Sequence, residues 1–557
     1  MPMVLRVLSG WNPERRELLG VLAIGLALAI WFTGPALFAS TPRLLGAPDS
    51  EVYSNVWVLW WGQQTLLETW AVPIWADTIN APSGRGVHCL PLMDALLTLP
   101  LHGWLSASAV YHLVVFGHVV FAAVSAAWFL RRFGAGPWLA LPGVIAFTTT
   151  STFVGAMASG PIESLGIGWM PFTMVLVLEA LSRGGRLRVA AAAVALGGCF
   201  LANPYYFVFT AVNLAWMSLL ELRGWPSRGW LLRAVVIGVG AIVIMVPQIM
   251  AIEMTPGLSP RDGDLALETQ LRMSTLSHDV LGLLLPVDGF NRDVVQRRIY
   301  VGLSVVGLAL AGVRRSGSRR WWVFAVVGCI YALGALPRLG GQSLGLSPFA
   351  LTLNRLPVLE NISHPFRMLP LVVLALGVLG AKALERLPPE RRRTGAIGAA
   401  VVIGLDLLVV SPARGLLPTT SAESPAFYHQ LGEELDPASV VVLDMVDGVT
   451  PNPSRALIHQ AVHQQKLLVD IMPPDRPWAD NGMVQLAQWR ADQPLPFVVE
   501  RMCADALSLS QIDVRYIVCH RSESSNPRWS VLAACGFPVV SATEAAVVVE
   551  IPRRESR

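Results

Sequence analysis

The sequence has little charge for its length. Only 14% of its 557 residues are Asp, Glu, Lys or Arg, whereas roughly a quarter of the residues in a soluble domain are charged. Hydrophobic residues make up 53% of the chain, so lipid rather than water must solvate most of it. Lysine is almost absent, and the net charge of +4 comes almost wholly from arginine. No basic tract with interleaved aromatic residues is present, which argues against nucleic-acid binding.

Cysteines are few and scattered, and none forms a CxxC motif or a Cys/His cluster, which argues against a zinc site. Cys503, Cys519 and Cys535 lie in the polar C-terminal part of the sequence. Two of them could form a disulfide if this part faces an oxidising compartment. Buried free thiols are an equally good interpretation.

Apolar stretches near the ~20 residues needed to cross a bilayer recur up to residue 412. The first, residues 18–39, is longer than the roughly 7–15 apolar residues of a secretory signal, so it is predicted to be an uncleaved span. The sequence predicts about eleven spans, near 18–39, 109–130, 136–158, 164–182, 188–203, 205–222, 232–253, 299–313, 321–337, 366–384 and 395–412.

Arginines set the expected orientation. With the N-terminus in the cytoplasm, each short inner connection is basic, as the positive-inside rule requires; these loops carry Arg131/Arg132, Arg183/Arg186/Arg188, Arg223/Arg228, Arg314/Arg315/Arg319/Arg320 and Arg386/Arg391/Arg392/Arg393. The long segments 40–108, 254–298 and 338–365, and everything after 413, should then face outward.

The predicted outer segments differ from the spans in their hydrophobic pattern. Within 40–108, apolar residues at helical spacing predict an amphipathic helix in the membrane interface, either as an anchor or as part of a site; they are Val56, Trp57, Trp60, Trp61 and Leu67. After 413, β-branched runs such as "ASVVVLDM", "VRYIVCH" and "AAVVVEI" alternate with helical stretches, which is typical of a small α/β domain. The predicted fold is a polytopic α-helical membrane domain (1–413) with a C-terminal extracytoplasmic α/β domain (414–557). The latter shows no nucleophile motif, and we interpret it as a lid or acceptor-recognition module or as a structural domain.

Several segments, in order, resemble the GT-C superfamily of membrane glycosyltransferases, and within it a large group of bacterial members. "SEVYSNVWVLWW" is similar to the family's acidic residue followed by a polar residue and a W-x-L-x-W run. "ADTINAPSGRGVHCLPLMDALLTLPL" is similar to its second outer-loop stretch, "SLGIGWMPFTMVLVLEAL" to a span that opens with W-x-P, and "LGLLLPVDGFN…RRIYVGLSVVGLAL" also fits. "LTLNRLPVLENISHPFRMLPLVVLALGVLGAKALERL" is similar to a segment in which L-P precedes an arginine that opens a late span.

The resemblance implies an enzyme that moves a hexosyl or pentosyl group from a polyprenyl-phosphate-linked donor to an envelope glycan, lipid or protein acceptor. The reaction would take place on the outer face of the bacterial cytoplasmic membrane. Such an enzyme needs a carboxylate for the acceptor hydroxyl and a cation for the leaving phosphate. The alternative is a non-catalytic relative or a lipid or glycan transporter. A transporter often shows inverted repeats and paired charges within its spans, and the sequence has neither.

Two carboxylates, Asp49 and Glu51, stand just beyond the first span and are the first candidates for a general base or for ligands of a divalent cation such as Mg²⁺ or Mn²⁺. The spacing of the family motif fits Glu51 better than Asp49, and both could instead be solvated acids ahead of a helix N-terminus. Glu163 lies in a very short outer turn and could point into the same cavity. His88 and Asp94 lie later in the first outer loop and could return to the site.

Arg367 is the first candidate for the donor phosphate, because it opens a span from the outer side, where a cation needs a headgroup or a ligand. A guanidinium can hold phosphate through two parallel hydrogen bonds. Snorkelling to lipid phosphate is the alternative. His364, Arg355 and Arg298 are weaker candidates for the same role.

Ionisable residues also fall inside the predicted spans. Asp406 lies in the last one, where either function or hydrogen bonding between helices explains it. His112 and His118 are six residues apart and do not share a helix face, so a metal pair is improbable.

Overall fold

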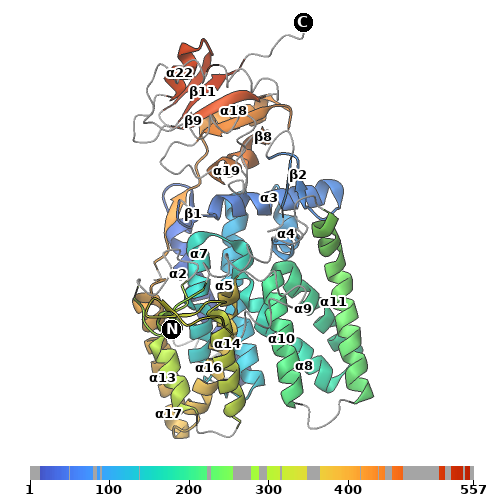
Figure 1. The fold of residues 1–557 in the computed structure, drawn as a ribbon, viewed down its shortest axis with the longest axis vertical. Helices are drawn as coiled ribbons and strands as arrows, with labels where there is room; N and C mark the ends of the chain where they lie inside the picture. Colours follow the sequence, from blue (N-terminus) through green and yellow to red (C-terminus); the bar gives the residue numbers. More distant parts are fainter. Residues whose placement is uncertain are drawn as a thin grey trace, which may run out of the picture.

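An elongated helical body and a smaller region of strands at one end make up the computed structural model (Figure 1). The structure describes residues 13–48, 50–79, 84–87, 91–136, 138–221, 227–254, 277–287, 298–313, 317–347, 364–413, 416–436, 438–445, 454–467, 503, 514–520, 528–543 and 546–551.

Each predicted span contains at least one helix in the structure, although several of these helices are short. The body contains α2 (Pro13–Leu37), α5 (Ala107–Arg132), α6 (Leu141–Thr148), α7 (Ser151–Ser159), α8 (Trp169–Arg183), α9 (Arg186–Ala202), α10 (Pro204–Glu221), α11 (Arg228–Met254), α13 (Leu303–Ala311), α14 (Arg319–Ala332), α16 (Leu369–Leu384) and α17 (Pro389–Leu405). Seven helical segments among the described residues are long and apolar enough to cross a bilayer, so the chain is a multi-pass membrane protein. Helices α9, α10, α13 and α14 are not among these seven, and the number of eleven spans stays a prediction.

A run of hydroxyl residues interrupts the third predicted span between α6 and α7. Thr148 and Thr149 donate their hydroxyls to carbonyls one turn back, at 2.8 Å and 2.7 Å, which competes with the regular helix ladder. Ser151, buried at the start of α7, donates to the carbonyls of Arg298 and Tyr300, both at 2.9 Å. At the break, a side-chain hydroxyl therefore satisfies two backbone carbonyls of the segment that precedes α13.

Close helix crossings in the body use glycine. A Cβ built on Gly143 of α6 would lie 3.2 Å from the Cα of Gly377 on α16. Small residues allow helix backbones to approach closely where lipid provides no hydrophobic drive between helices. A side chain at either position would push α6 away from α16.

Asp406 has a structural explanation. It lies in a short π-helical turn, Asp406–Val410, at the end of α17. Its Oδ2 accepts from the backbone N–H of Ser304 at 2.8 Å and from the Ser304 hydroxyl at 2.6 Å, and its Oδ1 accepts from the Tyr300 hydroxyl at 2.5 Å. The carboxylate thus satisfies an N-terminal amide of α13, in line with the interpretation as a hydrogen bond between helices.

The first outer loop contains β1 (Arg43–Leu45), α3 (Val52–Thr69), β2 (Trp75–Ala76), β3 (Arg85–Gly86), α4 (Leu92–Thr98) and the 3₁₀ turn η1 (Leu99–Leu101). Strand β1 pairs antiparallel with β6 (Thr419–Ser421), with Leu44 opposite Thr420. The predicted helix is present as α3, but residues 52–59 are buried on every side. The prediction of an amphipathic surface helix is therefore wrong for its first two turns, because α19 (Ser454–His463) of the C-terminal region packs over α3 (Figure 1).

The region beyond β6 is built on a five-stranded mixed sheet with strand order β10-β11-β9-β7-β8. Its elements are α18 (Ala426–Glu434), β7 (Val441–Met445), α19 (Ser454–His463), β8 (Lys466–Leu467), β9 (Val514–His520), α22 (Arg528–Ala534), β10 (Val539–Ala542) and β11 (Ala546–Glu550). Strand β7 is parallel to both β8 and β9, whereas β11 is antiparallel to β9 and β10. A separate hairpin, β4 (Arg338–Leu339) with β5 (Gln342–Ser343), lies outside this sheet. The division of the chain at residue 413 into two domains stays a prediction.

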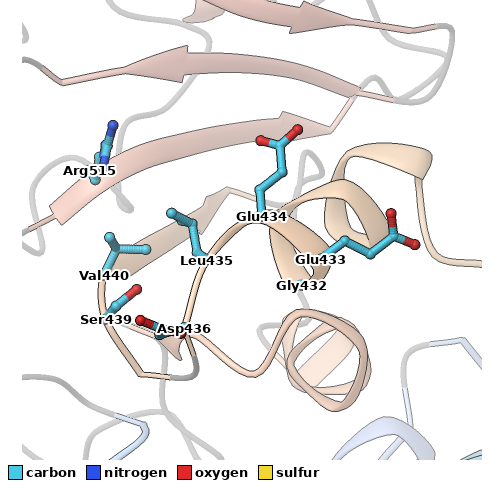
Figure 2. Close-up of a pocket in the computed structure, with 8 residues that line it drawn as sticks. All are labelled: Gly432, Glu433, Glu434, Leu435, Asp436, Ser439, Val440 and Arg515. Carbon is cyan, nitrogen blue, oxygen red and sulfur yellow. The ribbon is translucent and has the colours of Figure 1, made fainter.

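A polar surface hollow of about 510 Å³ lies where α18 ends beside β9 (Figure 2). Its lining carries three carboxylates, Glu433, Glu434 and Asp436, and the Arg515 guanidinium, which donates to Glu550 Oε1 at 3.2 Å. Burial raises the pKa of the neighbouring Tyr516 phenol, and the Arg515 charge opposes that shift. The hollow belongs to the sheet region.

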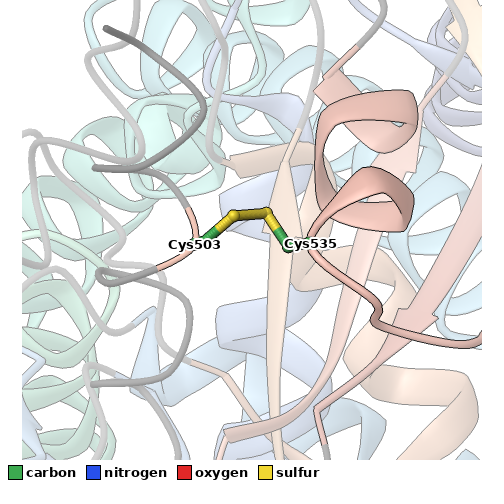
Figure 3. Close-up of a disulfide and its surroundings, with 2 residues drawn as sticks. All are labelled: Cys503 and Cys535. Carbon is green, nitrogen blue, oxygen red and sulfur yellow. A yellow bond between two sulfur atoms is a disulfide. The ribbon is translucent and has the colours of Figure 1, made fainter. Parts of the chain in front are cut away.

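A disulfide joins Cys503 to Cys535 (Figure 3). Cys519 is a buried thiol in β9. The sequence left the disulfide pairing open, and the structure shows that Cys503 pairs with Cys535.

We expect reduction of this disulfide to destabilise the sheet region. The bond links residues 32 positions apart, and a cross-link of that span contributes about 3 kcal/mol by restricting the unfolded chain. Mass spectrometry of peptides from non-reduced protein should find Cys503 linked to Cys535, with Cys519 alkylated only after unfolding. A linked peptide containing Cys519 would contradict the pairing.

Candidate functional site

An acid and an arginine from distant parts of the chain meet at the end of the helical body that faces α3. Glu163 lies in the 3₁₀ turn η2 (Ile162–Gly168), and Arg367 lies in η8 (Pro365–Met368). Arg367 Nη2 donates to Glu163 Oε1 at 3.2 Å, and the two side chains are only 12% and 18% exposed. Because little water reaches this pair, its electrostatic interactions are stronger than those of a surface ion pair.

Asn203 holds the Glu163 turn in place. Its Oδ1 accepts from the backbone N–H of Tyr205 at 2.8 Å, which caps the start of α10. Its Nδ2 donates to the carbonyl of Glu163 at 2.7 Å. A second link comes from the Tyr206 hydroxyl, which donates to the Ser164 carbonyl at 2.7 Å. The start of α10 therefore determines where Glu163 lies.

Aromatic rings surround the guanidinium. Arg367 Cζ lies 5.1 Å from the centre of the Tyr205 ring, a cation–π distance. The His364 ring packs edge-on against Tyr205 at 5.8 Å, and against Phe366 at 5.6 Å. His278 packs against the Phe366 ring in turn, at 5.4 Å. These rings restrict the orientation of Arg367 and bring His364 into its neighbourhood.

The start of α3 is fastened to the same turn. Glu51, the N-cap residue of α3, is exposed, and its backbone N–H donates to the Ser159 carbonyl at 3.0 Å. Asn55 donates to the Glu51 carbonyl at 2.9 Å and accepts from the Ile162 N–H at 3.0 Å. Glu51 and Glu163 thus come from two segments that a single asparagine bridges.

Gly160 makes this approach possible. Its φ is 92°, a conformation that favours glycine. A Cβ here would lie 2.5 Å from both the N and the Cα of Val52. Any side chain at residue 160 would therefore push the first turn of α3 away from Glu163.

The structure thus brings Glu51, Glu163, Arg367 and His364 into one region. The remaining predicted residues of that group, Asp49, His88 and Arg355, lie outside the described residues. The backbone of Arg298 lies elsewhere, against Ser151 at the far end of α7, about 12 Å along that helix from Ser159.

Asp94 has a different partner. Its Oδ1 lies 3.0 Å from His118 Nε2, and both side chains are buried, at 5% and 6% exposure. Thr98 donates to the Asp94 carbonyl at 2.6 Å and accepts from Gln63 at 2.8 Å, which ties α4 to α3. Asp94 therefore joins the first outer loop to α5.

Metal binding has limited support from these side chains. Among the residues that the structure describes, no group of three or more His, Cys, Asp or Glu is arranged to hold a metal ion. Glu51 and Glu163 offer two carboxylates from adjacent segments, and Asp49 lies outside the described part of the chain. A divalent cation at Asp49 and Glu51 stays a prediction.

Sequence reasoning missed Asn55, Asn203 and Tyr205. Asn203-Pro204 ahead of an apolar run is a helix-start signal, since Asn caps and Pro suits the first turn. It marks the turn, but it does not reveal the contact with Glu163. Nothing local in the sequence distinguishes Asn55 from other polar residues of α3.

Comparisons with known proteins agree on the fold. No protein-family model matches the chain, and no curated protein matches its sequence. The structure nevertheless has a fold similar to that of solved glycosyltransferases, in agreement with the fold that the sequence resemblance implied.

The arabinofuranosyltransferase AftD from Mycobacteria superposes on 97% of this chain with a TM-score of 0.56 and 14% sequence identity. A mutant of AftD superposes on 96% of this chain with a TM-score of 0.59 and 15% sequence identity. The archaeal oligosaccharyltransferase AglB from Archaeoglobus fulgidus, in complex with an inhibitory peptide and a dolichol-phosphate, superposes with 0.51 at 12% identity, over 94% of this chain and 71% of its own. The chain spans only 40–41% of the length of AftD.

Proposed function

We propose that this protein is a membrane glycosyltransferase that uses a polyprenyl-phosphate-linked sugar. The observation that carries the proposal is the shielded Glu163–Arg367 pair beside the start of α3, within a GT-C fold. The pair holds a guanidinium ready for the leaving phosphate, and the start of α3 beside it supplies the carboxylate that glycosyl transfer also needs. The lipid on the donor is consistent with the dolichol-phosphate bound to AglB.

Each group has a role in the proposed reaction. A carboxylate at the start of α3, Glu51 or Asp49, takes the proton from the acceptor hydroxyl. The acceptor oxygen forms a bond to the anomeric carbon of the sugar as the bond from that carbon to the phosphate oxygen breaks. The electron pair stays on the polyprenyl phosphate, whose growing negative charge Arg367 stabilises. Glu163 orients Arg367 through their hydrogen bond.

The ends of the helices support an outer-face site. Helix α8 begins next to η2, which carries Glu163, and ends at Arg183; α5 ends at Arg131 and Arg132. Because basic ends favour the cytoplasm, the site and the sheet region would face outward, and the Cys503–Cys535 disulfide agrees with an oxidising compartment there. We place the protein in the bacterial cytoplasmic membrane, acting on an envelope glycan, lipid or protein.

The Asp49→Ala, Glu51→Ala double variant tests the carboxylate role. We expect it to lower the transfer rate by about 10²–10⁴-fold, the range for loss of a general base. The assay uses purified protein in nanodiscs with polyprenyl-phosphate-linked arabinose, mannose or glucose, and mass spectrometry of the host's envelope glycans provides a second measurement.

Glu68→Ala is the matched control, because Glu68 lies at the exposed far end of the same helix, where it accepts a hydrogen bond from Gln64 one turn away, at 2.9 Å. Unchanged products from the double variant at normal protein level would remove the catalytic assignment. They would favour the non-catalytic relative or the transporter.

A further inference from the structure

One buried amide connects the C-terminal region to α3. Gln460, on α19, is 1% exposed, and its Oε1 accepts from Trp57 Nε1 at 2.5 Å. Its Nε2 donates to the Thr78 carbonyl at 2.7 Å and to the Gln465 carbonyl at 2.8 Å. An indole N–H only donates and a carbonyl only accepts, so these partners fix the orientation of the amide. A single side chain thus joins α3, the segment after β2 and the turn before β8.

Other hydrogen bonds fasten the same parts. The Thr78 carbonyl also accepts from the Leu467 N–H at 2.8 Å, which attaches the first outer loop to the edge strand β8. One turn before Trp57, the Tyr53 hydroxyl lies 2.7 Å from Thr420 Oγ1 and donates to the Ser421 carbonyl at 3.0 Å. Two successive turns of α3 are therefore bound to the chain that follows the last span.

Packing makes this contact rigid. Trp57 is fully buried and stacks on Trp61, with ring centres 5.4 Å apart and an interplanar angle of 5°. Both polar atoms of the buried Gln460 amide have partners, and such satisfied buried groups hold one arrangement strongly. Figure 1 shows α3 lying crosswise between α19 and the helical body.

The fastened turns lie close to the candidate carboxylate. Glu51 precedes Trp57 by six positions, which is about 9 Å along a helix. A tilt of α3 at Trp57 would therefore move Glu51 relative to Arg367, which belongs to the helical body and not to α3. Displacements near 1 Å are enough to slow an enzymatic step by about 100-fold.

We infer that the C-terminal region positions the carboxylate end of α3, and that Gln460 is the positioning residue. The inference rests on the proposed function, because it takes the acid at the start of α3 as the reacting group. Gln460 itself touches no reacting atom and acts through Trp57. The C-terminal region then holds α3 in the position that the proposed active site requires, in addition to any contact that it makes with the acceptor.

Gln460→Met tests this role, because methionine keeps the length of the side chain and removes all three hydrogen bonds. With a polyprenyl-phosphate-linked sugar in nanodiscs, we expect kcat to fall about 10–100-fold and the KM for the donor to change less than about twofold, because Arg367 is untouched. Hydrogen exchange of the backbone amides of residues 52–59 should become faster. Gln430→Met is the matched control, because Gln430 is exposed on α18 and donates to Glu434 on the same helix, at 2.7 Å.

The outcomes separate the two proposals. If Gln460→Met leaves kcat unchanged while the Asp49→Ala, Glu51→Ala variant is inactive, the positioning role is overturned and the proposed function stands. A rise in KM with unchanged kcat would also overturn it, since that is the signature of a substrate contact. Wild-type protein without transfer activity would remove both proposals. If Gln460→Met fails to accumulate, Trp57→Phe removes the indole N–H while keeping an aromatic ring at this position, and it should also lower kcat.

Discussion

Replacing Arg367 by methionine is expected to lower kcat/KM by about 10²–10³-fold, the cost of losing one preorganised donor to a developing anion. The guanidinium is 12% exposed, hydrogen-bonded to Glu163 and stacked over Tyr205, so its position is set before substrate arrives. Arg367→Lys keeps the charge but loses the planar fork, and its activity should lie between those of wild type and Arg367→Met. Transfer rates from a polyprenyl-phosphate-linked sugar in nanodiscs measure the effect.

Stability must be followed in the same variants, because Arg367→Met leaves Glu163 partly buried without this partner. We expect a loss of about 1.5–3 kcal/mol of unfolding free energy, typical for a hydrogen bond to a charged group. Arg338→Met is the matched control, since Arg338 is exposed on the β4–β5 hairpin. If Arg367→Met transfers sugar at a rate within threefold of wild type, the phosphate role of Arg367 is wrong.

Breaking the Asp94–His118 pair should produce the second large effect, on stability. Asp94→Ala leaves a buried imidazole without the oxygen that lies 3.0 Å away, and we expect a loss of about 2–4 kcal/mol of unfolding free energy. Denaturant unfolding of the purified protein in detergent measures this loss.

A double replacement distinguishes the pair from simple packing. Changing Asp94 and His118 together to leucine should recover most of the loss, because an apolar pair avoids the cost of burying charge. Asp77→Ala, at an exposed acid of the same loop, should have little effect. If Asp94→Ala is as stable as wild type, or if the double variant loses more than the sum of the single ones, the pair does not stabilise the loop against α5.

Much of the helical body follows from the sequence, since the long apolar runs became helices, apart from the third, which is broken into α6 and α7. Hydropathy works here because a backbone in lipid must satisfy its own hydrogen bonds, and the helix does so locally. Glu163 and Arg367 were each singled out by position, the first in a short outer turn and the second at the opening of a span. Their direct hydrogen bond was not foreseen, because it joins residues 204 positions apart.

The errors and omissions have the same origin. Helix α3 has the periodicity of a surface helix, but the chain after the last span packs over it. No local sequence pattern predicts this long-range packing. The sequence left open whether Asp94 returns to the site, and it gave no sign of the contact with His118 on α5. The roles of Asn55 and Asn203 depend on which turn lies beside them, which is a property of tertiary packing.

The pairing of β1 with β6 has a consequence for biogenesis. The Tyr53–Thr420 contact that accompanies this pairing joins residues 367 positions apart, and a ribosome making about 5–20 residues per second needs roughly 20–70 s to cover that distance. During this interval the segment 40–108 has been synthesised, but its final neighbours have not. In the orientation proposed above, a nascent chain stalled before the last span would carry the acids at the start of α3 without their support, and the proposed activity would have to wait until the C-terminal region had been exported.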